Sequence, residues 1–238
     1  IRNLKYNFQK QHFEKLCDRK FGIGADGVML INSHFEHDFH MQFYNPDGSK
    51  SFCGNGSRCA VLYCFHQGLC RRKTSFLTND GAHRAEILNS KDVKVNITSP
   101  IQVNELKNGD FKVNTGSPHY IKFTNELLNE NFLSKCREIR YSEDYKDEGI
   151  NVNFVVEKGK GIQVRTYERG VENETLSCGS GVTAAALSFA FLNNLKNIIN
   201  VNTKGGDLKV EYKLINMAFE NVYLIGPAHY VYRGEFDL

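Results

Sequence analysis

Two cysteines stand in the same local sequence. Cys53 opens a C-G-N-G motif and Cys178 opens C-G-S-G, and each motif leads into an apolar run long enough for a buried helix. A cysteine at a helix start lies beside unpaired backbone N–H groups and the positive end of the helix dipole, which favours its thiolate form. The adjacent glycines let backbone amides approach an anionic ligand such as a carboxylate. The motifs therefore predict two activated thiols.

Two thiols can perform chemistry that one cannot. Moving a hydrogen from one face of a carbon to the other requires a base on one face and an acid on the opposite face, which exchange roles for the opposite stereoisomer. Helix N-termini can also stabilise the carbanion that forms between the two steps. The pair is thus suited to inversion of configuration at a carbon. Buried structural thiols are the interpretation for the remaining cysteines, Cys17, Cys59, Cys64, Cys70 and Cys136.

The elements that must position the two thiols also repeat. A strand-like run at 39–44 and an NPDG turn precede the first motif, and an alternating run at 161–167 followed by a polar E-R-G loop precedes the second. The motifs lie 125 residues apart, about half the chain. We expect two similar halves that face each other, with a break near Gly116-Ser117-Pro118. Most other segments are β-like, which predicts an α+β fold with sheets wrapped around a few helices.

Composition excludes several other classes of protein. The chain has 238 residues, 41% hydrophobic and 24% charged, which is typical of a globular protein. The net charge is only +3 and the longest basic run is 71–73, so nucleic-acid binding is not indicated. No apolar stretch approaches the roughly 20 residues of a membrane span. Seven cysteines without a secretory segment favour reduced thiols in a cytoplasm. Because the chain begins with Ile1, we expect it to be trimmed or processed.

The chain resembles the diaminopimelate epimerase family, whose members are cofactor-independent amino-acid epimerases. The two cysteine motifs together with YERG make this resemblance specific, and the matching stretches follow one another along nearly the whole chain. They are FGIGADGVMLI (21–31), FYNPDGSKSFCGNGSRCA (43–60), GSPHY (116–120), GINVNF (149–154), TYERGVENETLSCGSGVTAAA (166–186) and GPAHYVYRG (226–234).

The resemblance implies two pseudo-symmetric lobes, each a mostly antiparallel sheet curled around a central helix, with the active site in the cleft between them. The N-terminal lobe would comprise residues 1–114 and 228–238, and the C-terminal lobe residues 115–227. The implied reaction interconverts LL- and meso-diaminopimelate, for lysine and peptidoglycan precursor synthesis in the cytoplasm, without pyridoxal phosphate, metal or other cofactor. The expected partner is this small substrate, with no nucleic acid and no membrane; a homodimer is compatible with the resemblance.

The resemblance also assigns roles to individual residues. Cys53 and Cys178 match the two acid/base cysteines, and His119 matches a histidine near the reacting centre. The remaining matches bind substrate: two asparagines that hold it, a charged pair for its distal amino-acid end, and helix-start residues that grip the carboxylate at the reacting carbon. These are Asn45 and Asn151, Glu168 and Arg169, and Gly54, Asn55, Gly179 and Ser180, respectively.

Taken without the resemblance, several of these residues have structural interpretations. Glu168 and Arg169 would be a surface charge pair in a turn, Asn45 a turn former, and His119 a packed, hydrogen-bonded histidine. The sequence also departs from the family in three places. The family's opening strand with a G-x-G-N-D-F motif is absent, Ser117 replaces a common Asn, and Gly27 replaces a Gln found in some members.

Alternatives remain at this stage. A proline or hydroxyproline racemase shares the two-thiol logic, but it typically has a histidine where this chain has Asn55. A phenazine-type isomerase shares the implied fold without paired cysteines. A zinc module could use the cysteines at 53, 59, 64 and 70, although their spacing lacks close pairs. The histidines at 34, 37 and 40 suggest a second possible metal cluster, and a catalytically inactive binding protein is a further possibility.

Overall fold

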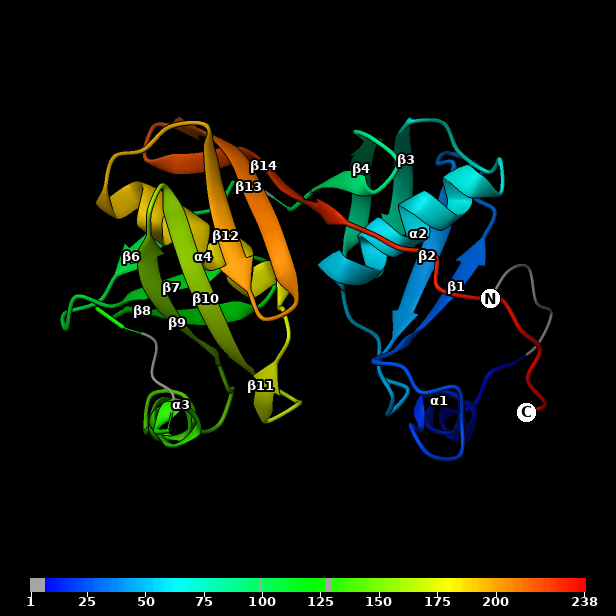
Figure 1. Cartoon of the computed structure of the whole chain (residues 1–238), viewed down its shortest axis with the longest axis horizontal. Helices are drawn as coiled ribbons and strands as arrows, with labels where there is room; N and C mark the ends of the chain where they lie inside the picture. Colours follow the sequence, from blue (N-terminus) through cyan, green and yellow to red (C-terminus); the bar gives the residue numbers. More distant parts are fainter. Residues whose placement is uncertain (1–6, 99, 127–129) are drawn as a thin grey trace. The chain divides into compact units, whose positions relative to one another are not determined.

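A computed structural model describes residues 7–98, 100–126 and 130–238. The chain divides into two compact units, which we call the first unit (Ile1–Val95 with Pro227–Leu238) and the second unit (Asn96–Gly226). In each unit a sheet curves around one central helix, α2 in the first and α4 in the second (Figure 1). Few helices and many strands make this an α+β fold, as the sequence predicted.

The first unit contains helices α1 (Lys10–Cys17) and α2 (Gly54–His66) and one sheet. Its strands follow the order β1-β2-β3-β4-β5, in which β2 and β3 are parallel and the other neighbouring pairs whose registers are resolved are antiparallel. The strands are β1 (Val28–Asn32), β2 (Phe39–Tyr44), β3 (Lys73–Thr78), β4 (Gly81–Ile87) and β5 (Asp92–Asn96). Side chains on β2 alternate between buried and half-buried, so one face of the sheet packs on α2.

The second unit contains α3 (Phe132–Arg140), α4 (Gly179–Leu192) and a larger sheet of order β14-β13-β12-β10-β9-β8-β7-β6, with β11 beside β10. The strands are β6 (Val103–Glu105), β7 (Phe111–Asn114), β8 (Pro118–Phe123), β9 (Asn151–Lys158), β10 (Gly161–Glu168), β11 (Asn173–Thr175), β12 (Ile198–Thr203), β13 (Gly206–Ile215) and β14 (Ala218–Pro227). The apolar α4 is buried along almost its whole length.

The two units share one arrangement. In each, a strand leads through a polar loop to the cysteine, the central helix follows, and the next strand pairs parallel to the first: β2 with β3, and β10 with β12. A helix is the usual crossover between parallel strands, which explains why both helices pack on their sheet. The same spacing of 125 residues separates Cys53 from Cys178, the start of β3 from the start of β12, and the start of β4 from the start of β13. The repeat predicted from the cysteine motifs therefore extends through the hairpin that follows each helix.

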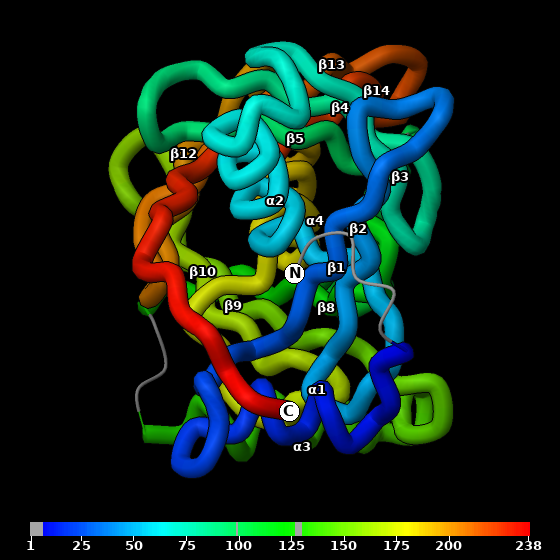
Figure 2. Tube along the Cα trace, turned by 90° about the vertical axis from the view of Figure 1, so that its right-hand side faces the viewer, coloured from blue at the N-terminus to red at the C-terminus, as the bar shows by residue number. Residues whose placement is uncertain are grey.

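The boundary between the units differs from the expected break near residues 114–118. Residues 96–114 lie in the second unit, because the hairpin β6–β7 pairs onto β8 through contacts such as Phe111 opposite Ile121. Gly116 forms the tight turn between β7 and β8, with a φ of 98° that favours glycine. A turn inside a hairpin has the same composition as a domain linker. The chain returns to the first unit at Pro227 and runs beside α2 (Figure 2).

Candidate active-site cysteines

Cys53 is the N-cap residue of α2. Its backbone is extended, its carbonyl accepts the first helical hydrogen bond from Ser57, and its Sγ accepts from the backbone N–H of Gly56 at 3.3 Å. Packing around Gly56 is tight, because a Cβ there would approach the Phe43 ring to 3.2 Å and the Met29 sulfur to 3.3 Å. A sulfur that accepts an N–H at a helix start is stabilised in its anionic form.

The loop before Cys53 is held from two sides. Within the loop, the Asn45 amide donates to the Ser49 hydroxyl at 3.0 Å and to the Ser51 hydroxyl at 3.2 Å, so Asn45 shapes the turn. From the β3–β4 turn, Asn79 donates to the carbonyl oxygens of Phe43 and Ser51, both at 3.0 Å.

A ring stack supports the residue immediately before Cys53. The Phe52 ring lies on the buried His83 ring of β4, with centroids 4.7 Å apart and planes 10° from parallel. His83 in turn contacts Asp80 at 3.0 Å, and hydrogen bonds from His83 and Thr78 hold the pKa of the Asp80 carboxyl below its usual value against the opposing effect of burial. Neither Asn79 nor His83 was identified from the sequence, because nothing in a β-hairpin pattern marks contacts with a distant loop.

Cys178 occupies the same position at the start of α4. It is the N-cap residue, it is buried, and its carbonyl accepts from the N–H of Val182. Its Sγ lies 3.3 Å from the Ser180 hydroxyl. The Ser180 Oγ also lies 3.0 Å from His119 Nε2. The structure thus brings Cys178, Ser180 and His119 into one hydrogen-bonded chain.

The direction of this chain follows from Asn153. Its Oδ1 accepts from the Thr166 hydroxyl at 2.8 Å and its Nδ2 donates to the Tyr120 carbonyl at 3.1 Å, which fixes the amide orientation. The Asn153 Nδ2 therefore donates to His119 Nδ1 at 3.1 Å, and the ring proton sits on Nε2. His119 Nε2 can then donate either to the Ser180 hydroxyl or to the equally close Ser117 hydroxyl, both at 3.0 Å, and the Ser180 hydroxyl is in position to donate to the Cys178 sulfur.

His119 remains neutral in this setting. It is fully buried on β8, and burial, with a smaller contribution from the charge of Arg169, lowers its pKa to about 3. A neutral imidazole can relay hydrogen bonds without competing with the thiol for a proton near pH 7. These contacts are those of a packed, hydrogen-bonded histidine, and a role for His119 near the reacting centre stays a prediction.

Ser117 joins the same network. Its hydroxyl lies 3.0 Å from His119 Nε2 and 3.4 Å from the Ser180 hydroxyl, and it accepts from the Asn151 amide at 3.3 Å. The replacement of Asn by Ser at this position thus keeps a polar contact. At Gly27, a Cβ would lie 2.4 Å from the Phe43 ring, so the backbone leaves no room for the Gln of other members.

Asn151, Glu168 and Arg169 lie together at the ends of β9 and β10. The Asn151 Oδ1 accepts from the backbone N–H of Arg169 at 2.9 Å, and the Arg169 guanidinium donates to the Glu148 carbonyl at 2.9 Å. Glu168 is half-buried at the end of β10.

A second charge pair secures this loop. Glu172 accepts from the Gly170 N–H at 3.1 Å and from the Arg140 guanidinium of α3 at 3.2 Å, and these contacts keep the pKa of Glu172 low although burial opposes this. Sequence reasoning missed Glu172 and Arg140, because a charge in a turn has no pattern that separates a support from a solvated residue. Gly181 was also not singled out; a Cβ there would lie 2.4 Å from the Asn153 Oδ1.

Of the other cysteines, Cys17, Cys64 and Cys136 are buried as expected, whereas Cys59 is exposed and Cys70 half-buried, so the expectation of burial was wrong for these two. Desolvation raises the pKa of Cys136 to about 12 and also raises the pKa of the thiols of Cys17, Cys59 and Cys70. None of the seven cysteines, all of which lie in the described ranges, forms a disulfide bond. Within the described ranges, no group of three or more His, Cys, Asp or Glu side chains is arranged to hold a metal ion. The His34 Nδ1 instead accepts the backbone N–H groups of Glu36 and His37.

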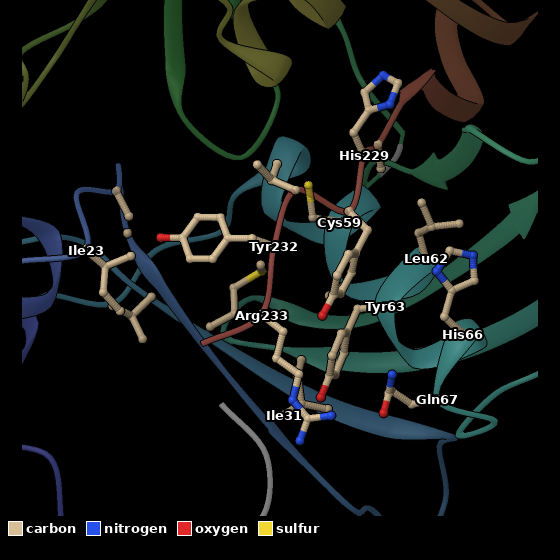
Figure 3. Close-up of a pocket in the computed structure, with 18 of the residues that line it drawn as sticks. Ile23, Ile31, Cys59, Leu62, Tyr63, His66, Gln67, His229, Tyr232 and Arg233 are labelled. Atoms are coloured by element: carbon tan, nitrogen blue, oxygen red, sulfur yellow. The ribbon is translucent and has the colours of Figure 1, made fainter. Parts of the chain in front are cut away.

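A pocket in the first unit has a volume of about 770 Å³ and lies between α2, β1 and the C-terminal segment (Figure 3). Cys59, Tyr63 and Tyr232 line it. None of the predicted site residues lines this pocket. In the part of the chain that the structure describes, every helix is too short to cross a membrane.

Comparison with known proteins shows which family the sequence resembles. A sequence profile described as diaminopimelate epimerase matches residues 2–103 and 111–231. A diaminopimelate epimerase of Flavobacterium psychrophilum is 41% identical over 238 residues, covering 98% of this chain and 93% of the relative. That of Aquifex aeolicus is 38% identical and covers 94% of this chain and 84% of the relative.

Solved structures of other enzymes share the fold. A phenazine biosynthesis PhzC/PhzF protein from Clostridium difficile, described as putative by its own name, aligns with a TM-score of 0.69 at 12% identity, covering 99% of this chain and 91% of that one. A hydroxyproline epimerase from Agrobacterium vitis aligns with a TM-score of 0.66 at 15% identity, covering 94% and 79%. At identities this low, the similarity shows only that the fold is shared.

Proposed function

The chain belongs to the diaminopimelate epimerase family, and we propose that it interconverts LL- and meso-diaminopimelate with two thiols, Cys53 and Cys178, one of which removes the α-proton while the other delivers a proton to the opposite face. The strongest support is that both cysteines cap the central helix of their unit and that each sulfur contacts a hydrogen-bond donor, Gly56 N–H or the Ser180 hydroxyl. The other cysteines with resolved shifts have raised pKa values, so they are poor bases.

The proposed reaction is balanced without any co-reactant. One thiolate takes the α-hydrogen as a proton, so a C–H bond breaks and an S–H bond forms, and the electron pair stays on the carbon. The opposite thiol then gives its proton to the other face of that carbon and becomes a thiolate. The reaction requires the two thiols to reach one carbon from opposite faces. The free enzyme regains its starting form by proton exchange.

Binding of the substrate supports both steps. We assign the carboxylate at the reacting carbon to the helix-start residues Gly54, Asn55, Gly179 and Ser180, whose N–H groups carry positive potential. This charge stabilises the carbanion more than the neutral ground state. Glu168 and Arg169 would bind the ammonium and carboxylate groups at the far end, with Asn45 and Asn151 holding the chain between. Both thiols must stay reduced, so we place the reaction in a cytoplasm.

Hydrogen exchange in heavy water tests the proposal. The reduced protein is incubated in D₂O separately with LL-diaminopimelate, meso-diaminopimelate, L-proline and trans-4-hydroxy-L-proline, and deuterium at the α-carbon is followed by NMR. We expect exchange with the two diaminopimelates alone. A thiol carries a single proton, so early deuterium should appear in the product isomer, delivered by the opposite thiol, and not in recovered substrate.

The outcomes separate the parts of the proposal. Early deuterium in recovered substrate would point to a single base and contradict the two-thiol mechanism. Exchange with proline or hydroxyproline only would keep the mechanism and overturn the substrate. Absence of exchange with all four compounds would contradict the proposed activity itself.

A further inference from the structure

Arg58 is a buried charge in the first turns of α2. Arg58 is only 5% exposed to solvent. It donates to the Gly54 carbonyl at 3.4 Å, to the Asn55 Oδ1 at 2.9 Å and to the Pro227 carbonyl at 3.5 Å. All three acceptors are neutral. No ion pair between Arg58 and an Asp or Glu occurs in the described part of the chain.

A guanidinium in this position needs a negative partner. Removing a charge from water costs several kcal/mol unless an opposite charge compensates it, and buried arginines are normally paired with carboxylates. Burial lowers the pKa of Arg58, and the nearby thiols of Cys59 and Cys53, when ionised, act in the opposite direction. The candidates for the missing negative charge are therefore these two sulfurs and an incoming ligand.

The groups around Arg58 show which of the two sulfurs is the better candidate for its negative partner. Cys59 is exposed and lies beyond the first turn of α2, where no unbonded backbone N–H is left to stabilise a thiolate, and desolvation by neighbouring groups raises its pKa despite the charge of Arg58. From the β3–β4 hairpin, Asp80 lies behind Phe52, where His83 and Thr78 occupy its carboxylate. From β1 and β2, Met29 and Phe43 present apolar atoms to the turn that follows Cys53. Cys53 remains as the sulfur that already accepts an N–H of this helix.

The second unit offers a matched position without the charge. Thr183 stands 125 residues after Arg58, and its hydroxyl donates to the Gly179 carbonyl at 2.9 Å, just as Arg58 donates to the Gly54 carbonyl. Thr183 is fully buried and neutral. Around Cys178 the structure places a hydroxyl and the uncharged His119, whose pKa the charge of Arg169 helps to lower. The two sulfurs therefore lie in similar hydrogen-bonding positions, but the helix position five residues further on holds a buried cation in the first unit and a neutral threonine in the second.

We propose that Arg58 is the counter-charge of the Cys53 thiolate, so that Cys53, and not Cys178, is the thiolate of the resting protein. The proton of Cys53 leaves to solvent, and the S–H electron pair stays on sulfur. Arg58 acts through Cys53 and does not itself contact the reacting carbon. The catalytic meaning rests on the proposed function: the resting protein would first deprotonate the stereoisomer whose α-hydrogen faces Cys53. The thiolate assignment itself needs no substrate.

The pH dependence of alkylation tests this assignment. Cys53 is measured in Cys178→Ala and Cys178 in Cys53→Ala, so that each midpoint belongs to one thiol. Iodoacetamide labelling is timed between pH 5 and 10 and assigned to each cysteine by peptide mass spectrometry. We expect the Cys53 midpoint to lie at least one pH unit below that of Cys178. In Cys178→Ala, adding Arg58→Met should slow labelling of Cys53 at pH 7 about tenfold or more, because a neighbouring charge shifts a pKa by roughly 1–3 units.

Two further variants separate charge from structure. Arg58→Lys keeps the charge and should restore most of the labelling rate lost in Arg58→Met. Thr183→Val, the matched change in the second unit, should leave the Cys178 midpoint in place. A Cys178 midpoint at or below that of Cys53 overturns the proposal even if Arg58→Met fails to fold. An unchanged Cys53 midpoint in a folded Arg58→Met protein also overturns it and leaves the substrate carboxylate as the partner of Arg58. These readings are independent of whether diaminopimelate is the substrate.

Discussion

The central helices of the two units are enclosed to different degrees. Strands β6 to β10, β12 and β13 all contact α4, which is buried along almost its whole length, whereas α2 contacts β1, β2 and β4 and leaves Cys59 and His66 exposed. Even so, the two N-caps are built alike, with extended backbones and a donor at each sulfur. The thiol environment is therefore made by the first helical turns and the loop before them, and not by the extent of the surrounding sheet.

The two caps also differ in how they hold a negative sulfur. At Cys53 the donor is a backbone N–H, with the buried guanidinium of Arg58 close by. At Cys178 the available side-chain donor is the Ser180 hydroxyl, which also contacts neutral His119. A cation acts over several ångströms, whereas a hydroxyl requires contact. A pseudo-symmetric pair of thiols can thus be unequal in acidity while remaining equal in position.

Replacement of either cysteine should have the largest effect. Cys53→Ala and Cys178→Ala are each expected to lower kcat for epimerisation by about 1,000-fold or more, because acid/base groups contribute roughly 10²–10⁴-fold each and the remaining thiol cannot reach both faces. Serine is a good N-cap, so Cys53→Ser and Cys178→Ser should fold normally and retain at most a trace. Activity is measured by following the conversion of LL- to meso-diaminopimelate.

Cys70→Ser is the matched control. Cys70 is half-buried in the first unit, where its thiol makes a long contact of 3.8 Å to the Val61 carbonyl and a hydrogen bond with Thr74. This variant should keep close to full activity. Full activity in either alanine variant would contradict the two-thiol mechanism and remove the basis for comparing the two caps.

Much of this arrangement could be predicted from the sequence, because it is local. The C-G-x-G motifs and the apolar runs after them predicted helices that the structure places at 54–66 and 179–192. The 125-residue repeat likewise predicted two similar halves, and the family resemblance pointed to Ser180 and His119, which the structure joins to Cys178 in one hydrogen-bonded chain. These features depend on neighbours in the chain, which a sequence displays directly.

The supports of the site could not be predicted in the same way. Asn153, Glu172 and Asn79 act on loops that are distant in sequence, and each is an ordinary polar residue in its own segment. Arg58 was hidden for another reason. An arginine in a helix normally extends into solvent, so its burial against carbonyl oxygens becomes visible only when the tertiary packing is known.

Lowering the pH should destabilise the second unit through His119. Its pKa falls from 6.5 to about 3 on folding, so between these values the unfolded chain binds a proton that the folded protein does not. Stability from this group is present above pH 6.5 and is lost as the pH falls towards 3. Between pH 7 and pH 5 the free energy of unfolding of the second unit should decrease by about 2 kcal/mol from His119 alone.

Urea unfolding measures this loss. The decrease between pH 7 and pH 5 should be smaller by about 2 kcal/mol in His119→Gln, which keeps polar atoms without a titrating group. Between pH 7 and pH 8 the wild type and the variant should change in parallel, which serves as the internal control. Equal losses for both proteins between pH 7 and pH 5 would show that His119 is not held neutral, and the contrast between a charged and an uncharged cap would then fail on the side of the second unit.

The smallest effects on stability and kcat are expected from substitutions in the β3–β4 and β12–β13 turns, which contact the segments before Cys53 and Cys178. Asn79 and Lys204 occupy matched positions, and each reaches the segment before its cysteine: Asn79 through two backbone carbonyls, and Lys204 through the Glu174 carboxylate at 2.5 Å. The second unit adds a backbone hydrogen bond from Gly205 to the Leu176 carbonyl at 2.8 Å, which no side-chain substitution removes. Asn79→Ala should therefore lower stability by about 1 kcal/mol and kcat by a few-fold.

Lys204→Ala is the matched variant for this comparison. Lys204 is half exposed, and surface ion pairs contribute about 0–1 kcal/mol, so its loss should change stability and kcat less than Asn79→Ala does. Iodoacetamide labelling adds a local measurement, because Asn79→Ala should alter the rate at Cys53 and not at Cys178. If Lys204→Ala proved the more damaging change, the loop before Cys178 would depend on its side-chain contacts, and the backbone bond from Gly205 would be too weak to hold that loop by itself.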